Sequence, residues 1–162
     1  MRFEILMDKR ENPDKCTIHP VKNRNDFSVR YFKSNDPIAA FESEILLHVG
    51  GECLSEWKKN NSTAKSLAVI DCNWKKVPAT LTRVAAPLPK FVKIPEGFVT
   101  AYPRRNKQGL DPDGGLATIE ALFIAAAFLG AWDETLLEKY YFREAFLKLN
   151  EPKWNEYRLG RK

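Results

Sequence analysis

The residues of this chain best suited to chemistry are an aspartate and a tryptophan, Asp71 and Trp74, which stand at the end of an apolar run. The run Leu67-Ala68-Val69-Ile70 predicts a strand covered on both faces, and ligands of open α/β sheets bind beyond the carboxyl ends of such strands. A carboxylate accepts hydrogen bonds from an ammonium group, and the face of an indole attracts an onium cation. Asp71 and Trp74 therefore suit a ligand that carries both kinds of cation.

The same two residues also allow a purely structural interpretation. Asp71 would then cap the turn or helix that begins at Lys75, and Trp74 would be buried as a hydrophobic lid. Both interpretations place Asp71 at the end of a strand, so the two alternatives stay open at the level of the sequence.

The composition predicts a soluble globular protein. The chain has 162 residues, of which 44% are hydrophobic and 12% aromatic, enough for a packed interior in one domain or in two small lobes that share a core. The apolar run from 116 to 131 is interrupted by Thr118 and Glu120 and is shorter than the roughly 20 residues that span a bilayer. The first residues also lack the apolar stretch of a signal peptide. We therefore expect a cytoplasmic monomer without a membrane partner.

The cysteines and histidines form no metal-binding motif. Cys16, Cys53 and Cys72 share no close spacing, and His19 and His48 are the two histidines of the sequence. Such spacing suggests neither a disulfide framework nor a zinc site. The sequence predicts reduced cysteines and no metal.

The formal net charge of +5 permits contact with a polyanion, because a positive field raises the rate of encounter with phosphate backbones. The charge is partly clustered, with Arg104, Arg105 and Lys107 in a loop and Arg158, Arg161 and Lys162 at the C-terminus. Tyr102 lies beside the loop and offers a stacking surface for a base. We predict that Tyr102 and the three loop cations bind RNA.

Short strands and loops make up the first half of the predicted fold. Strand character is found from Met1 to Met7, Phe27 to Phe32, Ile45 to Val49 and Leu67 to Asn73, and Ser55 caps a short helix from Trp57 to Asn61. Prolines in the middle of the chain favour extended segments and turns, with one further strand from Phe98 to Ala101.

The second half is predicted to be helical. Residues 116–129 are apolar nearly all round and predict a buried helix, while residues 134–149 predict a helix entered through Asp133 and stopped by Asn150 and Pro152. An apolar stripe on the second helix is expected to face the core rather than to stack on bases. It consists of Leu137, Tyr141, Ala145 and Leu149, with Phe142 and Phe146 beside it. The predicted fold class is α/β, with an α/β lobe over residues 1–87 and a mainly helical lobe over residues 88–162 that completes the ligand site.

Four segments, taken in order, resemble the small-subunit ribosomal RNA aminocarboxypropyltransferases of ribosome biogenesis. Asn12-Pro13-Asp14-Lys15-Cys16-Thr17 is similar to the family's Asp-Pro-Lys-x-Cys-Thr loop, and Ile70-Asp71-Cys72-Asn73-Trp74 is similar to its Val-Asp-Cys-Ser-Trp signature. Leu116-Ala117-Thr118-Ile119-Glu120-Ala121-Leu122 resembles its Leu-Ser-x-x-Glu-Ala-Leu helix start. Phe146-Leu147-Lys148-Leu149-Asn150, with Tyr157 beyond, resembles its Phe-Leu-x-Leu-Asn ending. The resemblance spans nearly the whole chain.

This resemblance implies a fold like that of the SPOUT RNA methyltransferases, with a trefoil knot linking the two lobes. It implies that the chain binds S-adenosylmethionine and transfers its 3-amino-3-carboxypropyl group to a ring nitrogen of a uridine or pseudouridine in RNA, leaving methylthioadenosine. The expected partner is small-subunit ribosomal RNA or a pre-ribosomal particle.

The resemblance also implies roles for individual residues. Asp71 would hold the ammonium of S-adenosylmethionine, Trp74 and Val77 would pack on its methyl and sulfonium, and Thr17 would meet its carboxylate. The positions implied for the adenine, the ribose and their surroundings are Leu47, Val49, Ile70, Leu88 and Leu116. No residue is assigned as a general base, because a carboxylate paired with the ammonium would be poorly placed and too weakly basic.

The chain departs from the family's pattern in four places. The segment between Val77 and Leu88 aligns poorly, and Ile18-His19-Pro20 follows Thr17 where the family has a glycine. Residues 100–107 stand where the family usually reads Ala-Ala-Asn-Pro-x-Asn-Tyr-Gly, and Phe142-Arg143 replaces a Trp-Gly pair. Two alternatives therefore stay open. One is a SPOUT-type RNA methyltransferase, which would leave S-adenosylhomocysteine, and the other is a non-catalytic RNA-binding factor of ribosome assembly.

Overall fold

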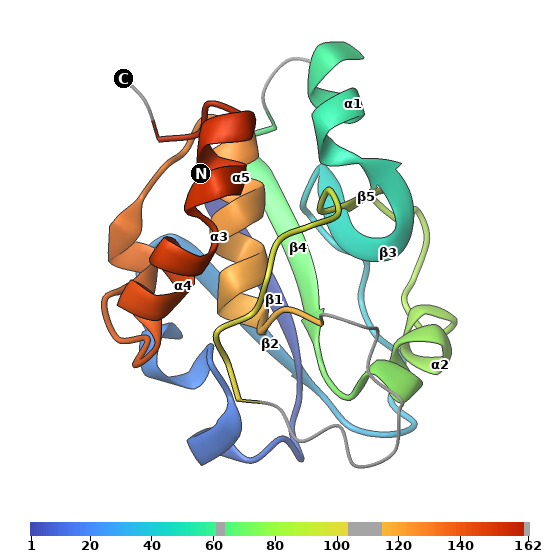
Figure 1. The fold of residues 1–162 in the computed structure, drawn as a ribbon. Coiled ribbons are helices and arrows are strands. Elements are labelled where there is room, and N and C mark those ends of the chain that lie inside the picture. The colour runs from blue at the N-terminus through green and yellow to red at the C-terminus, as the bar shows by residue number, and fades with distance from the viewer. Residues whose placement is uncertain (61–63, 104–114, 161–162) are drawn as a thin grey trace.

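The computed structural model describes residues 1–60, 64–103 and 115–160, and it contains one five-stranded parallel sheet (Figure 1). The strands are β1 (Arg2–Asp8), β2 (Phe27–Phe32), β3 (Ile45–Cys53), β4 (Ser66–Asp71) and β5 (Lys90–Lys93), in the order β2-β1-β4-β3-β5. The α-helices are α1 (Leu54–Asn60), α2 (Val77–Leu81), α3 (Thr118–Phe128), α4 (Arg143–Leu149) and α5 (Glu151–Glu156). Short 3₁₀ helices are η1 (Pro13–Lys15), η2 (His19–Val21), η3 (Trp74–Lys76) and η4 (Glu134–Leu137).

Strand β4 lies in the middle of the sheet and has Asp71 at its carboxyl end, as the sequence predicts, although it stops two residues before the predicted Asn73. Its first four residues are buried, because β1 and β3 pair with its two edges and other segments cover its two faces. Met7 of β1 is level with Asp71 in the register. The aspartate therefore stands at the carboxyl end of the central strands, where open α/β sheets bind ligands.

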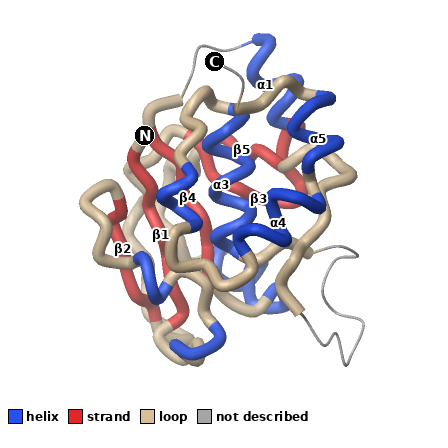
Figure 2. The backbone as a smooth tube through the Cα atoms, turned by 60° about the vertical axis from the view of Figure 1, so that its left-hand side comes forward, coloured by secondary structure: helices blue, strands red, loops and turns tan. Residues whose placement is uncertain are grey.

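Helix α3 anchors the larger hydrophobic cluster. Its side chains are buried except for those of Thr118 and Ala121, and Phe123 packs edge-on against Phe146 and Trp154 of the C-terminal helices. Figure 2 shows α3 with β2, β1 and β4 to one side and α4 and α5 to the other. Burial of a large apolar side chain contributes ~1.5–3 kcal/mol to the stability of the fold. Because α3 is apolar on all sides, it holds the sheet on one side and α4 and α5 on the other.

The opposite face of the sheet carries a smaller hydrophobic cluster. Residues of β1, β2, β3 and β4 pack there against the segments around residues 38–41 and 84. The members of this cluster are Leu6, Phe32, Ile38, Phe41, Leu46, Ala68 and Val84. Both faces of the sheet are thus covered, which is the usual condition of a parallel sheet.

The fifth strand is not where the sequence predicts it. Residues 98–101 form an extended loop, and the strand is β5, which pairs with β3. The loop is held by side chains instead of by a neighbouring strand: the Val99 amide donates to Asn150 Oδ1 at 2.7 Å and the Ala101 amide to Glu120 Oε1 at 2.9 Å. The local sequence pattern predicts that the backbone is extended, but it does not identify the side chains that accept its hydrogen bonds.

Strand β3 continues past the predicted Val49, with a register shift against β5 between Leu47 and Glu52. Gly51 lies in this irregular stretch, and a Cβ built on it would come within 2.4 Å of the Val92 amide nitrogen. Only a glycine fits so close an approach of two backbones.

The single helix predicted over residues 134–149 is wrong. The chain forms η4, a turn, and then α4, and α5 follows directly after Asn150 with Pro152 in its first turn. Asp133 does begin the segment, since its carboxylate accepts from the Thr135 amide at 3.0 Å. The expected apolar stripe is also wrong: Leu137 is buried, but Tyr141, Ala145 and Leu149 are exposed.

The two halves of the chain share the sheet and the larger core. Strand β5 lies beyond residue 87, yet it pairs with β3, and the larger cluster includes residues from Phe3 to Leu159. No helix in the described ranges is long and apolar enough to cross a membrane.

Candidate functional site

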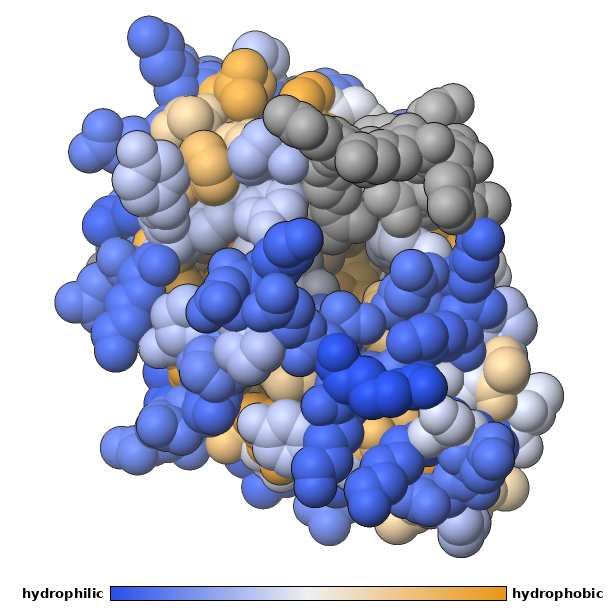
Figure 3. All heavy atoms as spheres, turned by 90° about the horizontal axis from the view of Figure 1, so that it is seen from below, coloured by the Kyte–Doolittle hydropathy of each residue, from blue (hydrophilic) through white to orange (hydrophobic). Residues whose placement is uncertain are grey.

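A cavity of about 1290 Å³ lies at the carboxyl end of the sheet. The carboxyl ends of β1 and β4 point to the bottom of Figure 1, and Figure 3 shows that end of the molecule face on, with hydrophilic residues gathered over it. The walls come from the loop after β1, the middle of β3, the end of β4, the segment after β5 and the start of α3. Segments far apart in the sequence therefore meet around one space.

Asp71 is held in this cavity by two uncharged donors. The Cys16 thiol donates to Oδ2 at 3.1 Å, and the Thr118 hydroxyl donates to Oδ1 at 2.7 Å. The residue that caps η3 is Asn73, whose side chain accepts from the Lys75 amide at 3.0 Å. The interpretation of Asp71 as a helix cap is therefore wrong, because its carboxylate turns toward the β1 loop and α3.

The two thiols beside Asp71 keep their protons. Burial, together with the charge of Asp71 and the hydrogen bond to it, raises the pKa of Cys16 to about 12. Burial and the charges of Asp8, Asp71 and Glu11 raise the pKa of Cys72 to about 12. At neutral pH the Cys16 thiol is therefore a hydrogen-bond donor to Asp71, not a nucleophile.

Trp74 and Val77 line the same cavity as Asp71. Val77 is buried at the start of α2, whereas Trp74 is half-buried and retains exposed surface. The interpretation of Trp74 as a buried lid is thus wrong: the end of β4 and the cap at Asn73 leave part of the indole accessible.

Thr17 lines the cavity at the loop after β1. Its hydroxyl oxygen accepts from the Ile119 amide in the first turn of α3 at 3.2 Å. The neighbouring Lys15 carbonyl accepts from the Tyr102 hydroxyl at 3.1 Å. The loop is therefore tied from two directions, and the Thr17 hydroxyl keeps its own proton for donation.

The other predicted cofactor positions divide into two groups. Leu47, Val49, Ile70 and Leu116 line the cavity, as does Tyr102. Leu88 does not: it precedes β5, whose amino end lies at the opposite edge of the sheet from the cavity, and its side chain is exposed. Arg104, Arg105 and Lys107 lie outside the described residues.

Glu120 is a buried carboxylate that accepts four hydrogen bonds. In the sequence it is noted only as part of the motif from Leu116 to Leu122. It accepts from Thr100 Oγ1 at 2.7 Å, from the Ala101 amide at 2.9 Å, from the Ala117 amide at 2.8 Å and from the Tyr140 hydroxyl at 2.8 Å. The donors belong to three separate segments. Glu120 therefore sets the position of the cavity wall at residues 100–102 relative to α3 and to the turn at Tyr140.

Asp8, the last residue of β1, stabilises two segments next to the cavity through ion pairs. Its side chain is fully buried and pairs with Lys76 at 2.8 Å and with Arg10 at 3.1 Å. Burial acts to raise the pKa of this carboxyl, but the hydrogen bonds from Arg10 and Lys76 outweigh it and hold the pKa well below its usual value. These bonds join the loop after β1 to the helix that carries Trp74.

His48 also lines the cavity, and no sequence pattern gives it a role. Its Nδ1 accepts from the Gly50 amide at 3.1 Å and its ring packs against that of Phe91, with 4.8 Å between centroids. Burial lowers the pKa of the imidazole. Across the described ranges, no three His, Cys, Asp or Glu side chains are grouped to hold a metal ion.

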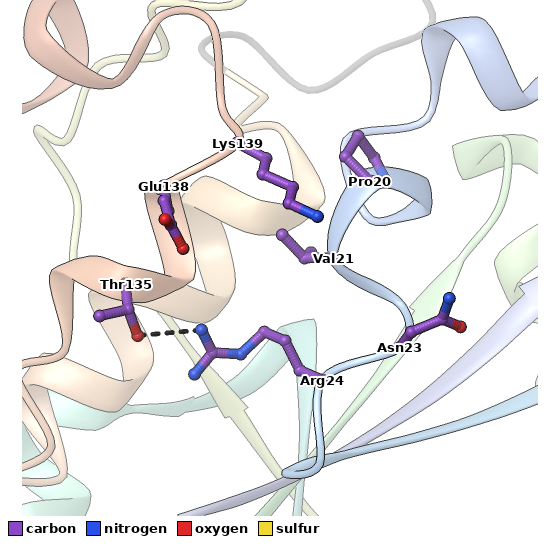
Figure 4. Close-up of a pocket in the computed structure, with 7 residues that line it drawn as sticks. All are labelled: Pro20, Val21, Asn23, Arg24, Thr135, Glu138 and Lys139. Atoms are coloured by element: carbon purple, nitrogen blue, oxygen red, sulfur yellow. Dashed lines mark hydrogen bonds between the residues drawn. The ribbon is translucent and has the colours of Figure 1, made fainter.

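A second, smaller cavity of about 230 Å³ lies between η2 and η4 (Figure 4). Arg24 reaches into it and donates to Thr135 Oγ1 at 2.9 Å, and it also pairs with Asp26 and Asp133. The guanidinium is thus neutralised by the chain itself.

No protein-family model and no curated protein matches the chain. Among solved structures, it is similar to the SAM-dependent rRNA:acp-transferase Tsr3 from Vulcanisaeta distributa, with a TM-score of 0.65 and 22% sequence identity. The match covers 96% of this chain and 82% of that chain. The chain thus has the mixed α/β fold of that protein, built on a five-stranded parallel sheet.

Proposed function

We propose that this chain is an enzyme that transfers the 3-amino-3-carboxypropyl group of S-adenosylmethionine to a ring nitrogen of a uridine or pseudouridine in ribosomal RNA, releasing methylthioadenosine. The observation that carries the proposal is that Asp71 and Trp74 line one cavity, at the carboxyl end of the sheet, in a fold shared with an rRNA:acp-transferase.

The side chains that line the cavity fit S-adenosylmethionine. Asp71 accepts one hydrogen bond on each oxygen, and a carboxylate has about four acceptor sites, so lone pairs are left for an ammonium. Trp74 is half-buried beside the apolar Val77, which suits a methyl and a sulfonium. Thr17 retains a proton for the ligand's carboxylate.

The residues of the chain bind and orient rather than exchange protons. When bound, S-adenosylmethionine supplies an activated carbon next to a sulfonium leaving group. Asp71 and Thr17 would hold the amino-acid end, while Trp74 and Val77 would cover the methyl. Such placement can supply much of the rate of an in-line displacement, so no general base is assigned among these residues.

The cavity has space for more than one ligand. Its volume of about 1290 Å³ exceeds the roughly 300–1,000 Å³ of most small-molecule sites. A nucleobase can therefore enter beside S-adenosylmethionine, and Tyr102 in the cavity wall offers a ring to it.

The finer features of the proposal come from the family resemblance. We propose small-subunit ribosomal RNA or a pre-ribosomal particle as the substrate and a cytoplasmic monomer as the acting species. We also propose that the chain is knotted, with its lobes divided between residues 87 and 88. The sheet and core that the two halves share are compatible with lobes that pack closely.

The test is mass spectrometry of the products formed from S-adenosylmethionine and unmodified small-subunit ribosomal RNA, with an RNA-free control. We expect methylthioadenosine only when RNA is present, with a matching mass gain on one nucleoside. S-adenosylhomocysteine would identify a methyltransferase instead, and the absence of both products would contradict transfer to this RNA.

Two variants test the site itself. Asp71→Asn removes a charge from a hydrogen-bonded ion pair and should weaken S-adenosylmethionine binding about tenfold or more. Trp74→Ala should weaken it about tenfold through loss of the onium contact. Asp36→Asn, in an exposed loop after β2, is the matched control. Calorimetric affinities that stay unchanged in both site variants would overturn the assignment.

A further inference from the structure

Tyr141 is the most exposed large hydrophobic side chain of the described residues, at 92%. A single exposed aromatic residue needs no special explanation in a soluble protein. Tyr141, however, occupies a turn whose other aromatic residues are packed, so its exposure is a property of the turn and not of a frayed end.

The turn is held firmly on both sides of Tyr141. Tyr140 is buried and its hydroxyl bonds to Glu120, while Arg143 pairs with Glu134 at 2.6 Å. The Tyr140 amide donates to the Leu137 carbonyl at 2.9 Å, and the Arg143 amide donates to the Tyr140 carbonyl at 3.0 Å. The backbone on both sides of Tyr141 is thus anchored, while the Tyr141 side chain is exposed to solvent.

Three aromatic rings connect this place with the cavity. Phe142 is half-buried, and its ring meets Tyr141 edge-on at 4.9 Å and Tyr102 edge-on at 6.0 Å between centroids. Tyr102 lines the cavity. We name Tyr141, Phe142 and Tyr102 the aromatic track: it runs from an exposed ring on the surface to the wall of the candidate active site.

Glu120 fixes both ends of the aromatic track. Its Oε1 accepts from the Tyr140 hydroxyl next to Tyr141 and from the Ala101 amide next to Tyr102. A single buried oxygen atom therefore ties Tyr140, which precedes Tyr141, to Ala101, which precedes Tyr102.

Two lysines are near the aromatic track in the chain, and the side chain of one of them, Lys139, turns toward the second cavity. Lys15, whose carbonyl accepts from Tyr102, and Lys139, two residues before Tyr141, are exposed, and neither ammonium forms an ion pair within the described ranges. Figure 4 shows the Lys139 side chain extending toward Pro20 and Val21. A cation near an exposed aromatic ring suits the phosphates and bases of a single strand of nucleic acid.

We propose that the aromatic track binds single-stranded RNA, with Tyr141 stacking on a base next to the nucleotide that enters the cavity. The inference rests on the proposed function and deepens it by naming where the RNA lies. Single-stranded RNA is favoured because unstacked bases are read by aromatic side chains, whereas double-stranded RNA is recognised by shape. The positive net charge of the chain favours the same partner.

The first test measures the affinity of a fluorescent uridine-rich single-stranded RNA for the full chain. Tyr141→Leu keeps apolar surface but removes the ring, and should weaken binding about tenfold, within the range for loss of one base stack. Tyr141→Trp should bind as tightly as the parent. Tyr31→Leu is the control, since Tyr31 is exposed at 51% on the edge strand β2, away from the aromatic track.

A second test locates the contact directly. RNA carrying 5-iodouridine is irradiated with the protein, and the tryptic peptide from Tyr140 to Arg143 is examined for a nucleotide adduct. We expect the adduct in the parent chain and its loss in Tyr141→Leu. Equal RNA affinity of the parent and Tyr141→Leu, an absent adduct, or a parent chain that binds no RNA overturns the proposal.

The outcomes separate this proposal from the transferase. S-adenosylmethionine affinity should be the same in Tyr141→Leu and in the parent, because Tyr141 does not line the cavity. If Tyr141→Leu loses RNA affinity while the parent forms no methylthioadenosine, the transferase fails and the RNA surface stands. If methylthioadenosine forms and Tyr141 has no effect on RNA binding, the transferase stands and the aromatic track fails.

Discussion

At the scale of the residue, the central group of the site is a carboxylate oriented by neutral donors. Cys16 and Thr118 approach the two oxygens of Asp71 from different elements. Neutral donors fix the direction of the carboxylate without cancelling its charge. An arginine or a lysine would also orient the carboxylate, but it would neutralise the charge. The negative charge therefore stays available for a cationic ligand.

This arrangement predicts that Cys16 is a positioning residue. Cys16→Ala should raise the dissociation constant for S-adenosylmethionine by about three- to tenfold, the effect of one lost hydrogen bond. Cys16→Ser keeps a donor and should restore affinity toward the parent value. Calorimetry on both variants, with Cys53→Ala as the control, measures the difference. Equal affinities for the alanine and serine variants would show that the thiol does not act through Asp71.

At the scale of the element, the start of α3 organises the site. Thr118 bonds Asp71, the Ile119 amide bonds Thr17, and Glu120 bonds the wall at residues 100–101. These are three consecutive residues, and they reach three different segments of the chain. The first turn of α3 thus determines how the parts of the cavity fit together.

We therefore expect Glu120→Gln to be strongly destabilising. All four partners of Glu120 are donors, so an amide nitrogen in place of either oxygen would face two of them. Each buried group left without a partner costs ~1–3 kcal/mol, which predicts a loss of about 2–5 kcal/mol in the free energy of unfolding. Urea denaturation measures it, with Glu144→Gln on the exposed side of α4 as the control. A change below 1 kcal/mol would contradict this role.

Some helices and strands of this fold are predictable from the sequence alone, and others are not. β4 and α3 were predicted well because their apolar runs are continuous and end in clear signals. The break in the helix before α4 is not predictable from local sequence, because the hydrogen bond from Tyr140 to Glu120 that holds the turn joins residues 20 positions apart. The partners of Asp71 are 55 and 47 positions away, so no local spacing reveals them. A short strand such as β5 lacks enough residues to show a period.

At the scale of the whole molecule, stability should depend on Asp8. The folded pKa of this carboxyl lies below the value in the unfolded chain, so the unfolded chain takes up the proton first as the pH falls. The stabilisation from Asp8 is thus complete above about pH 4 and is lost as the pH falls through the lower folded pKa.

The matching variant is Asp8→Asn. It should lower the melting temperature at pH 7, where the ion pairs with Arg10 and Lys76 are intact, and the gap to the parent should narrow toward pH 2. Scanning calorimetry across this range measures the gap. Asp14→Asn, in the exposed η1 segment, serves as the control. A gap that stays constant with pH would rule out Asp8 as the group responsible.

The raised pKa values of Cys16 and Cys72 bear on the durability of the site. With a pKa of about 12, a thiol at pH 7 is ionised in about one molecule in 100,000. Peroxides and disulfides react with the thiolate form. At neutral pH, Cys16 and Cys72 should therefore react with peroxides and disulfides far more slowly than an ordinary cysteine, which favours retention of the hydrogen bond from Cys16 to Asp71.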